Sequence, residues 1–213
     1  MFCRRTRLTL FIQGELDEQV MRETLQEIGE QVVFGVGGAG CAVAAGLCRH
    51  KAGAPYYLLD VEPPATYGCG SAEVIHLGKG HHRPTAAPSE VDLERYTVGA
   101  LPRIDAALLN HARDVLVIAA LGGTTGRTVA PLLIERARLF GKTVHSFVWL
   151  PTVFEDPASR PRSLASLQRV MLESDATYVQ NNDWLVQQHR NLCGPRFWGL
   201  VESNLVGQIL KMV

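Results

Sequence analysis

Two glycine-rich stretches organise this sequence: Gly35-Val36-Gly37-Gly38-Ala39-Gly40 and Leu121-Gly122-Gly123-Thr124-Thr125-Gly126. Each follows an apolar, β-branched run and precedes a helical pattern. A glycine turn lets backbone N–H groups approach an anion without interference from Cβ atoms, and the helix that follows directs its unpaired N–H groups and positive dipole end toward that anion. Two such turns in one chain predict a single phosphate-binding cradle.

Outside the turns, apolar periodicity alternates between strands and helices. Predicted strands cover residues 8–12, 32–34, 56–60, 73–77, 114–120, 143–149 and 176–179. Predicted helices cover 15–30, 39–50, 90–111, 125–140, 162–173 and 198–213, with a break or kink at Pro102 and a C-terminal glycine at Gly141. This alternation predicts an α/β fold, a three-layer α/β/α sandwich with a mostly parallel, Rossmann-like sheet, in which both turns lie at the carboxyl ends of strands.

Composition narrows the class of protein. The 213 residues include 21 Lys and Arg and 21 Asp and Glu, so no net charge favours nucleic acid, and no apolar run is long enough to span a membrane. We therefore expect a cytoplasmic protein without a nucleic-acid or membrane partner. The 5 cysteines fit reduced thiols better than a disulfide framework, and His76, His81 and His82 lack the companion ligands of a metal site.

The first turn by itself leaves the nucleotide open. Gly35, Gly37 and Gly40 satisfy the dinucleotide pattern G-x-G-x-x-G, and Asp60 ends the next strand, where an acid binds a ribose hydroxyl. The same stretch resembles the Gly-rich loop of adenylating enzymes of the ubiquitin-activating type. A Rossmann-type NAD- or ATP-dependent enzyme is therefore one hypothesis, although neither scheme accounts for the second turn.

Both turns together resemble the tubulin/FtsZ family of GTP-binding proteins. Residues 36–40 are similar to the first phosphate loop of that family, and residues 121–131 to its signature G-G-G-T-G-[ST]-G and the helix start after it. Residues 86–91 resemble the G-A-N-P-E-V stretch that faces the terminal phosphate. The order of these segments along the chain agrees with the family, and the resemblance covers about residues 31–213.

Three later segments extend the resemblance. Pro151-Thr152-Val153-Phe154-Glu155 is similar to the segment that supplies a ribose-contacting acid, here Glu155, with Arg160 near the family's nucleotide-contacting basic residue. Asn182-Asp183-Trp184-Leu185 resembles the N-D-x-L loop whose Asn contacts the nucleotide. Residues 197–202 resemble the start of the central helix, which implies that Trp198 stacks on guanine and that the Glu202 carboxylate accepts hydrogen bonds from its ring N1–H and exocyclic amine.

The resemblance implies a nucleotide-binding domain over residues 31–213, a strand-helix extension over 1–30 packed on it, and GTP or GDP as ligand, with Mg²⁺ held through the phosphates. It implies no catalytic residue and no dedicated metal ligand. The expected nucleotide-binding residues are Gly37, Gly38, Ala39, Gly40, Cys41, Asp60, Ala86, Ala87, Gly122, Gly123, Thr124, Thr125, Gly126, Arg127, Glu155, Arg160, Asn182, Trp198 and Glu202.

The signature loop departs from the family pattern at three positions. Thr124 and Thr128 replace glycines, and Arg127 replaces a small hydroxyl residue. The Arg127 guanidinium suits two opposite roles, a clamp on phosphate oxygens or a plug in the cradle. Cys41 stands where the family usually has a polar residue.

In this family an acid-bearing loop after the central helix activates water in the site of a neighbouring subunit. The given sequence ends at Val213, within that helix, so we expect slow or absent intrinsic GTP hydrolysis. The leading hypothesis is a GTP-dependent switch or assembly factor that self-associates or binds an FtsZ- or tubulin-like partner. A degenerate module that acts through protein interactions without nucleotide is the alternative.

Overall fold

The structure, a computed structural model, describes residues 8–12, 31–50, 54–62, 70–78, 88–110, 114–153, 155, 158–189, 191 and 194–210. The helix expected over 15–30 and the predicted site residues Ala86 and Ala87 lie outside these ranges. Predictions for them therefore stay predictions. No helix in the described ranges is both long enough and apolar enough to cross a membrane.

Seven strands form one sheet in which all neighbouring pairs are parallel. Their order across the sheet is β1-β7-β6-β5-β2-β3-β4. All seven predicted strands are confirmed, with ends that shift by no more than about two residues. The strands are β1 (Leu8–Ile12), β2 (Gln31–Val36), β3 (Tyr56–Asp60), β4 (Ala72–His76), β5 (Asp114–Ala120), β6 (Thr143–Leu150) and β7 (Ala176–Asn181).

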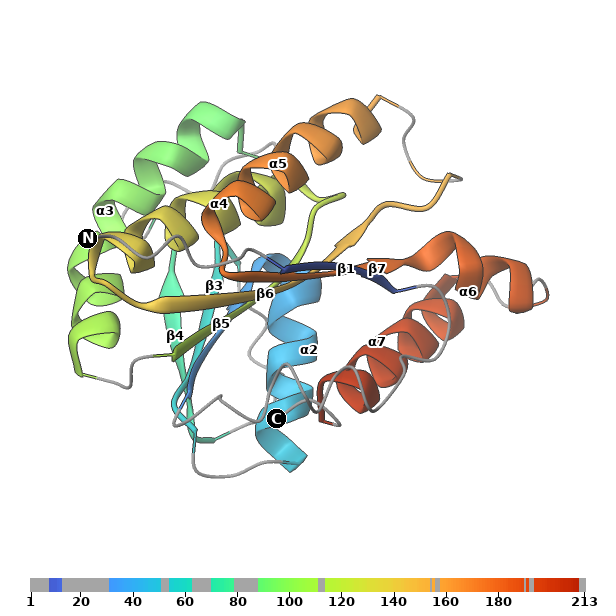
Figure 1. The fold of residues 1–213 in the computed structure, drawn as a ribbon, viewed down its shortest axis with the longest axis horizontal. Helices are drawn as coiled ribbons and strands as arrows, with labels where there is room; N and C mark the ends of the chain where they lie inside the picture. The colour runs from blue at the N-terminus through green and yellow to red at the C-terminus, as the bar shows by residue number, and fades with distance from the viewer. Residues whose placement is uncertain are drawn as a thin grey trace.

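Helices cover both faces of the sheet, which confirms the three-layer architecture (Figure 1). On one face lie α3, α4 and α5, and on the other lie α2 and α7. A shorter helix, α6, follows β7. The helix bounds are α2 (Gly37–His50), α3 (Glu90–Asn110), α4 (Thr124–Leu139), α5 (Arg160–Glu173), α6 (Asn182–Gln188) and α7 (Gly194–Leu210).

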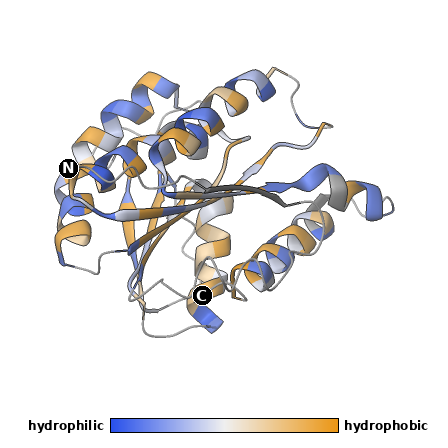
Figure 2. Ribbon diagram, in the orientation of Figure 1, coloured by the Kyte–Doolittle hydropathy of each residue, from blue (hydrophilic) through white to orange (hydrophobic). Residues whose placement is uncertain are grey.

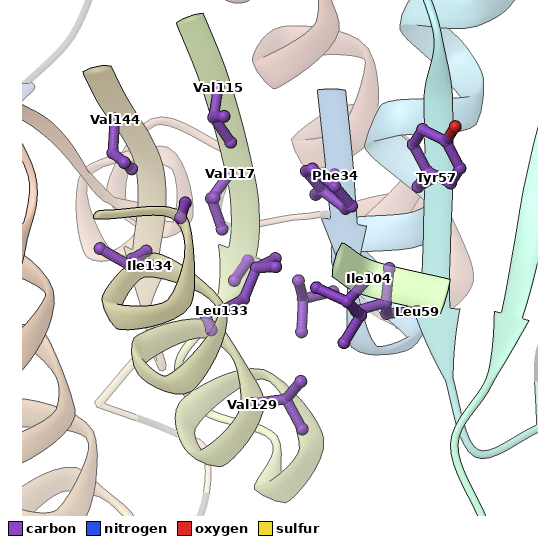
Figure 3. Close-up of a cluster of buried hydrophobic side chains, with 14 of the residues drawn as sticks. Phe34, Tyr57, Leu59, Ile104, Val115, Val117, Val129, Leu133, Ile134 and Val144 are labelled. Carbon is purple, nitrogen blue, oxygen red and sulfur yellow. The ribbon is translucent and has the colours of Figure 1, made fainter. Parts of the chain in front are cut away.

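Alternation along the strands fills two apolar cores. In β2, Val32, Phe34 and Val36 enter the core beneath α3, α4 and α5, whereas Val33 enters the core beneath α2 and α7. Figure 3 shows Phe34 in the first core, whose other members include Leu133 of α4. Figure 2 shows hydrophilic residues on the outer faces of the helices, as amphipathic helices over a buried sheet require.

The direction in which strands are added reverses between β2 and β5, which are neighbours at the centre of the sheet. From β2 the chain continues through β3 to β4, and from β5 it continues the opposite way through β6 to β7. The loops after β2 and β5 therefore lead to helices on opposite faces of the sheet, which is the position at which doubly wound folds bind ligands. Both glycine turns lie at this point.

Of the break or kink predicted at Pro102, the break does not occur, since α3 continues across this residue. Pro102 and Val98, the residue whose carbonyl loses its intrahelical partner, are both exposed, and the buried Ile104 holds the next turn against the core. The predicted end of α4 is confirmed. Gly141 has φ +70°, its N–H donates to the Arg138 carbonyl, and Lys142 N–H donates to the Ala137 carbonyl, which is a Schellman motif.

Two other expectations change. Residues 182–185, predicted to be a loop, form the start of α6, because the Asn181 side chain caps the helix by accepting from Asp183 N–H at 3.0 Å. The expectation of reduced thiols is wrong for Cys48, which is disulfide-bonded, while Cys41 is a free, buried thiol.

Candidate nucleotide-binding site

The two glycine turns touch each other at the carboxyl ends of β2 and β5. Gly37, the first residue of α2, has φ +72°, and a Cβ built on it would lie 3.1 Å from the Gly126 nitrogen and 3.4 Å from Thr125 Cβ. A side chain at Gly37 would thus combine backbone strain with a collision against the second turn. The structure brings together the two stretches that the sequence predicts to form one cradle.

Glycine also allows both helices to lie directly on β5. A Cβ at Gly40 would come within 2.4 Å of the Ile118 carbonyl oxygen, and one at Gly126 within 2.0 Å of the Ala120 carbonyl oxygen. Both distances are shorter than atoms tolerate, so α2 and α4 begin where they do only because these residues are glycine. The N-termini of the two helices consequently converge on the end of one strand.

The N-terminus of α4 is open. Its N-cap, Gly123, has extended backbone angles (φ −78°, ψ 152°) and makes no side-chain cap hydrogen bond, and no atom of the described residues lies within 4 Å of a Cβ built on it. Gly38 and Ala39 of the first turn are exposed. First-turn N–H groups of an uncapped helix are donors for an anion, and the helix dipole favours negative charge there.

Arg127 lies in the first turns of α4, and its guanidinium reaches back to the second glycine turn. Nη1 donates to the Gly122 carbonyl at 3.1 Å and Nη2 to Thr124 Oγ1 at 3.3 Å. Nε donates to Glu90 Oε1 at 2.9 Å, which forms an ion pair with the start of α3. Glu90 belongs to the segment 86–91 that resembles a phosphate-facing stretch, but its pairing with Arg127 was not predicted, because 37 residues separate the two.

Pro151 and Glu155 pack beside the second turn. Glu155 Oε1 accepts from Thr152 N–H at 2.7 Å, and its Oε2 lies 3.4 Å from the Cβ position of Gly122. The predicted acid is therefore at the cradle. Arg160 donates to the Pro151 carbonyl at 3.4 Å.

Asp183 connects this segment to α6. Its Oδ1 accepts from Val153 N–H at 2.7 Å, and its Oδ2 lies 3.6 Å from Arg160 Nη1. The structure thus joins three segments that are separate in the sequence, namely 151–155, the start of α5 and the start of α6. Asp183 belongs to the motif that suggested Asn182, but its bridging role was not predicted.

Two buried amides lie at the end of β7. Asn182 is 1% exposed and Gln180 is 0% exposed, and none of their side-chain nitrogen or oxygen atoms has a hydrogen-bond partner among the residues that the structure describes. A buried amide without a partner is costly, so a bound group that pairs with it gains stabilisation. Asn182 was predicted to contact nucleotide, whereas Gln180 was missed because a strand residue in an apolar run carries no motif.

The predicted base-contacting residues lie on α7, which packs against α2. Trp198 is 43% exposed and meets the Phe197 ring edge-on, with centroids 5.4 Å apart. Glu202 Oε1 lies 3.7 Å from Arg49 Nη2, near the C-terminal end of α2. Glu202 Oε1 also lies 3.9 Å from the Cβ position of Gly46, so this side chain lies away from the turns, about 14 Å along α2 from Gly37 at the helical rise per residue. A nucleotide bound at the turns would have to extend along α2 to reach it.

Cys41 lies in the core and not on the cradle, and Asp60 lies partly buried at the end of β3. Cys41 Sγ is buried and contacts the carbonyls of Gly35 at 3.3 Å and Leu59 at 3.5 Å, and burial raises the pKa of its thiol. Asp60 Oδ1 accepts from Val61 N–H at 2.8 Å, and burial raises the pKa of its carboxyl. The Cys41 side chain thus serves the core, as a small apolar residue would. Within the described residues, no three His, Cys, Asp or Glu side chains gather as metal ligands.

Curated proteins that are similar to this chain include cell division proteins. Cell division protein FtsZ 1 of Pyrococcus horikoshii is 27% identical over 177 residues, which is 82% of this chain and 47% of the relative. Cell division protein FtsZ of Aquifex aeolicus is 33% identical over 76 residues, which is 36% of this chain and 21% of the relative. The chain spans about half the length of most of the curated relatives it matches.

Solved structures share the fold. The empty FtsZ dimer of M. jannaschii aligns with TM-score 0.74 and 20% identity, over 90% of this chain and 56% of that one. GDP-bound monomeric CetZ1 of Haloferax volcanii aligns with TM-score 0.70 and 20% identity, over 84% of this chain and 58% of that one. Residues 30–189 match the family model for the GTPase domain of the Tubulin/FtsZ family, and the chain therefore belongs to that family.

Proposed function

We propose that this domain binds a guanine nucleotide, with its phosphates at the two glycine turns and its base toward α7. The observation that carries the proposal is the contact between the turns, in which the Gly37 Cβ position lies 3.1 Å from the Gly126 nitrogen. This contact directs backbone N–H groups from two helix N-termini to one place. Mg²⁺ would bind through phosphate oxygens and water, as it usually does with nucleotides.

The other predicted residues would hold the ribose and base. Glu155 lies beside Gly122 and suits a ribose hydroxyl, and the unpaired, buried amide of Asn182 can pair with ribose or base. Trp198 is exposed enough to stack on a base. Glu202 would accept from guanine N1–H and its exocyclic amine, a donor pair that adenine lacks.

We infer that hydrolysis by this domain alone is slow or absent. The carboxylates near the second turn already have partners, since Glu90 pairs with Arg127 and Glu155 accepts from Thr152 N–H. Positioning and charge stabilisation would then act without a group that orients the attacking water. A second copy or another protein would have to supply that group, which fits a role as a switch or assembly module in the cytoplasm.

Thermal unfolding with GTP, GDP, ATP and NAD, each with and without Mg²⁺, tests the proposal. A ligand at a hundred times its Kd adds about 2.7 kcal/mol to the free energy of unfolding, which shifts the melting temperature measurably. Stabilisation by guanine nucleotides alone is the expected result. Selective stabilisation by ATP or NAD would instead favour a Rossmann-type or adenylating enzyme.

A charge variant gives this experiment its control. Gly123→Asp places a carboxylate at the N-terminus of α4 without a steric clash, because none of the described residues comes within 4 Å of its Cβ position. We expect this variant to keep its fold and lose at least tenfold in nucleotide affinity through repulsion of the phosphates. Gly99→Asp adds the same charge at another open glycine, in α3, and should bind normally.

The alternative, an interaction module without nucleotide, rests on Arg127. Its guanidinium hydrogen-bonds Gly122 and Thr124 within the turn, where it can fill part of a phosphate site. Absence of stabilisation by every nucleotide, in a protein that unfolds cooperatively, would favour this second function.

A further inference from the structure

A charged pair joins the N-termini of two helices beside the second glycine turn. Glu90 is the first residue of α3, and Arg127 lies in the first turns of α4. The pair is asymmetric, because the Arg127 side chain is 9% exposed and that of Glu90 is 44% exposed. Arg127 is thus fixed inside the turn, whereas Glu90 sits at its surface.

The placement of Arg127 is electrostatically unfavourable for its own helix. A cation near the positive end of a helix dipole is destabilising, and α4 has no side-chain cap to offset it. The Glu90 carboxylate neutralises this charge and also suits the N-terminus of α3. Without such a carboxylate, the guanidinium and the open N–H groups of α4 would attract a further anion.

The geometry also assigns which part of a nucleotide would meet this pair. Trp198 and Glu202 lie on α7, across the sheet from α3 and α4 (Figure 1). A nucleotide with its base at α7 and its phosphates at the turns has its terminal phosphate farthest from α7. That phosphate is therefore the one nearest to the pair.

We propose that the Glu90–Arg127 pair makes this site prefer a nucleoside diphosphate to the corresponding triphosphate. The inference rests on the proposed nucleotide binding. In the pair, Arg127 Nε already donates to Glu90, and the carboxylate neutralises much of the positive charge of Arg127. The exposed Glu90 carboxylate also repels an added phosphate. Both charges lie close to the turn. Salt therefore screens their interaction with a phosphate bound there only in part, because the Debye length is about 8 Å at physiological ionic strength.

Affinities for GDP and for a non-hydrolysable GTP analogue, measured by calorimetry in wild type, Glu90→Gln and Glu94→Gln, test this inference. The affinity of wild type should be higher for GDP than for the analogue, by about fivefold, which is the size of effect expected from one carboxylate near the added phosphate. Glu90→Gln should remove most of that preference by tightening the analogue. Glu94→Gln removes the same charge one turn further along the exposed side of α3 and should keep the wild-type ratio.

Arg127→Gln provides the second arm. It should weaken the analogue more than GDP, and Glu90→Gln should then have a smaller effect on the ratio in the Arg127→Gln background than in wild type. Unfolding midpoints without nucleotide check that each variant is folded. If both nucleotides bind wild type and Glu90→Gln leaves their ratio unchanged, the inference is wrong while the proposed function stands. If neither binds, the proposed function itself fails.

Discussion

Asp60 ends β3 beside the first glycine turn, and its carboxyl is partly buried. Burial raises the pKa of Asp60 above its ordinary value of 3.8, although the Val61 N–H opposes this shift. The folded state therefore binds the proton more tightly than the unfolded state, so this residue contributes stability at low pH that is lost as the pH rises through the folded pKa.

Asp60→Asn removes this ionisation and keeps an oxygen that can accept from Val61 N–H. Without nucleotide, we expect the variant to be more stable than wild type at neutral pH, with a difference that shrinks as the pH falls toward 4. Urea unfolding at a series of pH values measures it. Asp105→Asn is the matched control, and its effect on stability at neutral pH should have the opposite sign, because two hydrogen bonds from Arg136 lower the pKa of Asp105. A constant advantage of Asp60→Asn at every pH would contradict the assignment.

Single residues also mark the limit of what the sequence predicts about the site. The glycines of both turns were predictable, because only their backbone freedom and small size are needed there. The partner of Arg127 was not predictable, since Glu90 reaches it only through the packing of α3 against α4. Gln180 carried no signal at all, because its unpaired amide is a property of the folded environment.

At the scale of elements, two glycines with opposite roles test the helix assignments. Gly141 ends α4 with φ +70°, a conformation that costs other residues about 1 kcal/mol or more, so Gly141→Ala should destabilise the protein by that amount. Gly99 lies within α3, exposed and without contacts at its Cβ position, so Gly99→Ala should stabilise by about 0.5–1 kcal/mol. Denaturant midpoints of the two variants should move in opposite directions. A shift in the same direction would contradict one of the two environments.

The strands were predictable from two signals in the sequence, long apolar runs and the turn residues that end them. β5, which is buried along most of its length, shows the first signal as an uninterrupted apolar run. The errors have specific causes. Pro102 was expected to break or kink α3, but it is exposed and tertiary packing keeps the helix continuous. The start of α6 was not predicted, because the residue that caps it, Asn181, lies in β7 and directly precedes the N-D-x-L segment that was predicted to be a loop.

The position of β1 in the sheet bears on the predicted division between residues 1–30 and the rest of the chain. β1 pairs with β7 at one edge of the sheet, with Leu8 opposite Ala176 and Ile12 opposite Gln180. The glycine turns follow β2 and β5, which lie further into the sheet. β1, the described strand of the extension predicted over 1–30, therefore lies at the edge of the sheet, away from the strands that lead into the cradle.

Removal of residues 1–30 should separate stability from nucleotide binding. Without β1, the backbone donors and acceptors of β7 become an open edge, which favours pairing with another copy. We expect a lower melting temperature and more self-association by light scattering, while guanine nucleotide still stabilises the truncated protein. Removal of residues 1–7 alone is the control, because it leaves the β1–β7 pairing intact. Equal melting temperatures for the two truncated proteins would contradict the pairing of β1 with β7. Loss of nucleotide binding only on removal of residues 1–30 would mean that the site extends to the edge of the sheet.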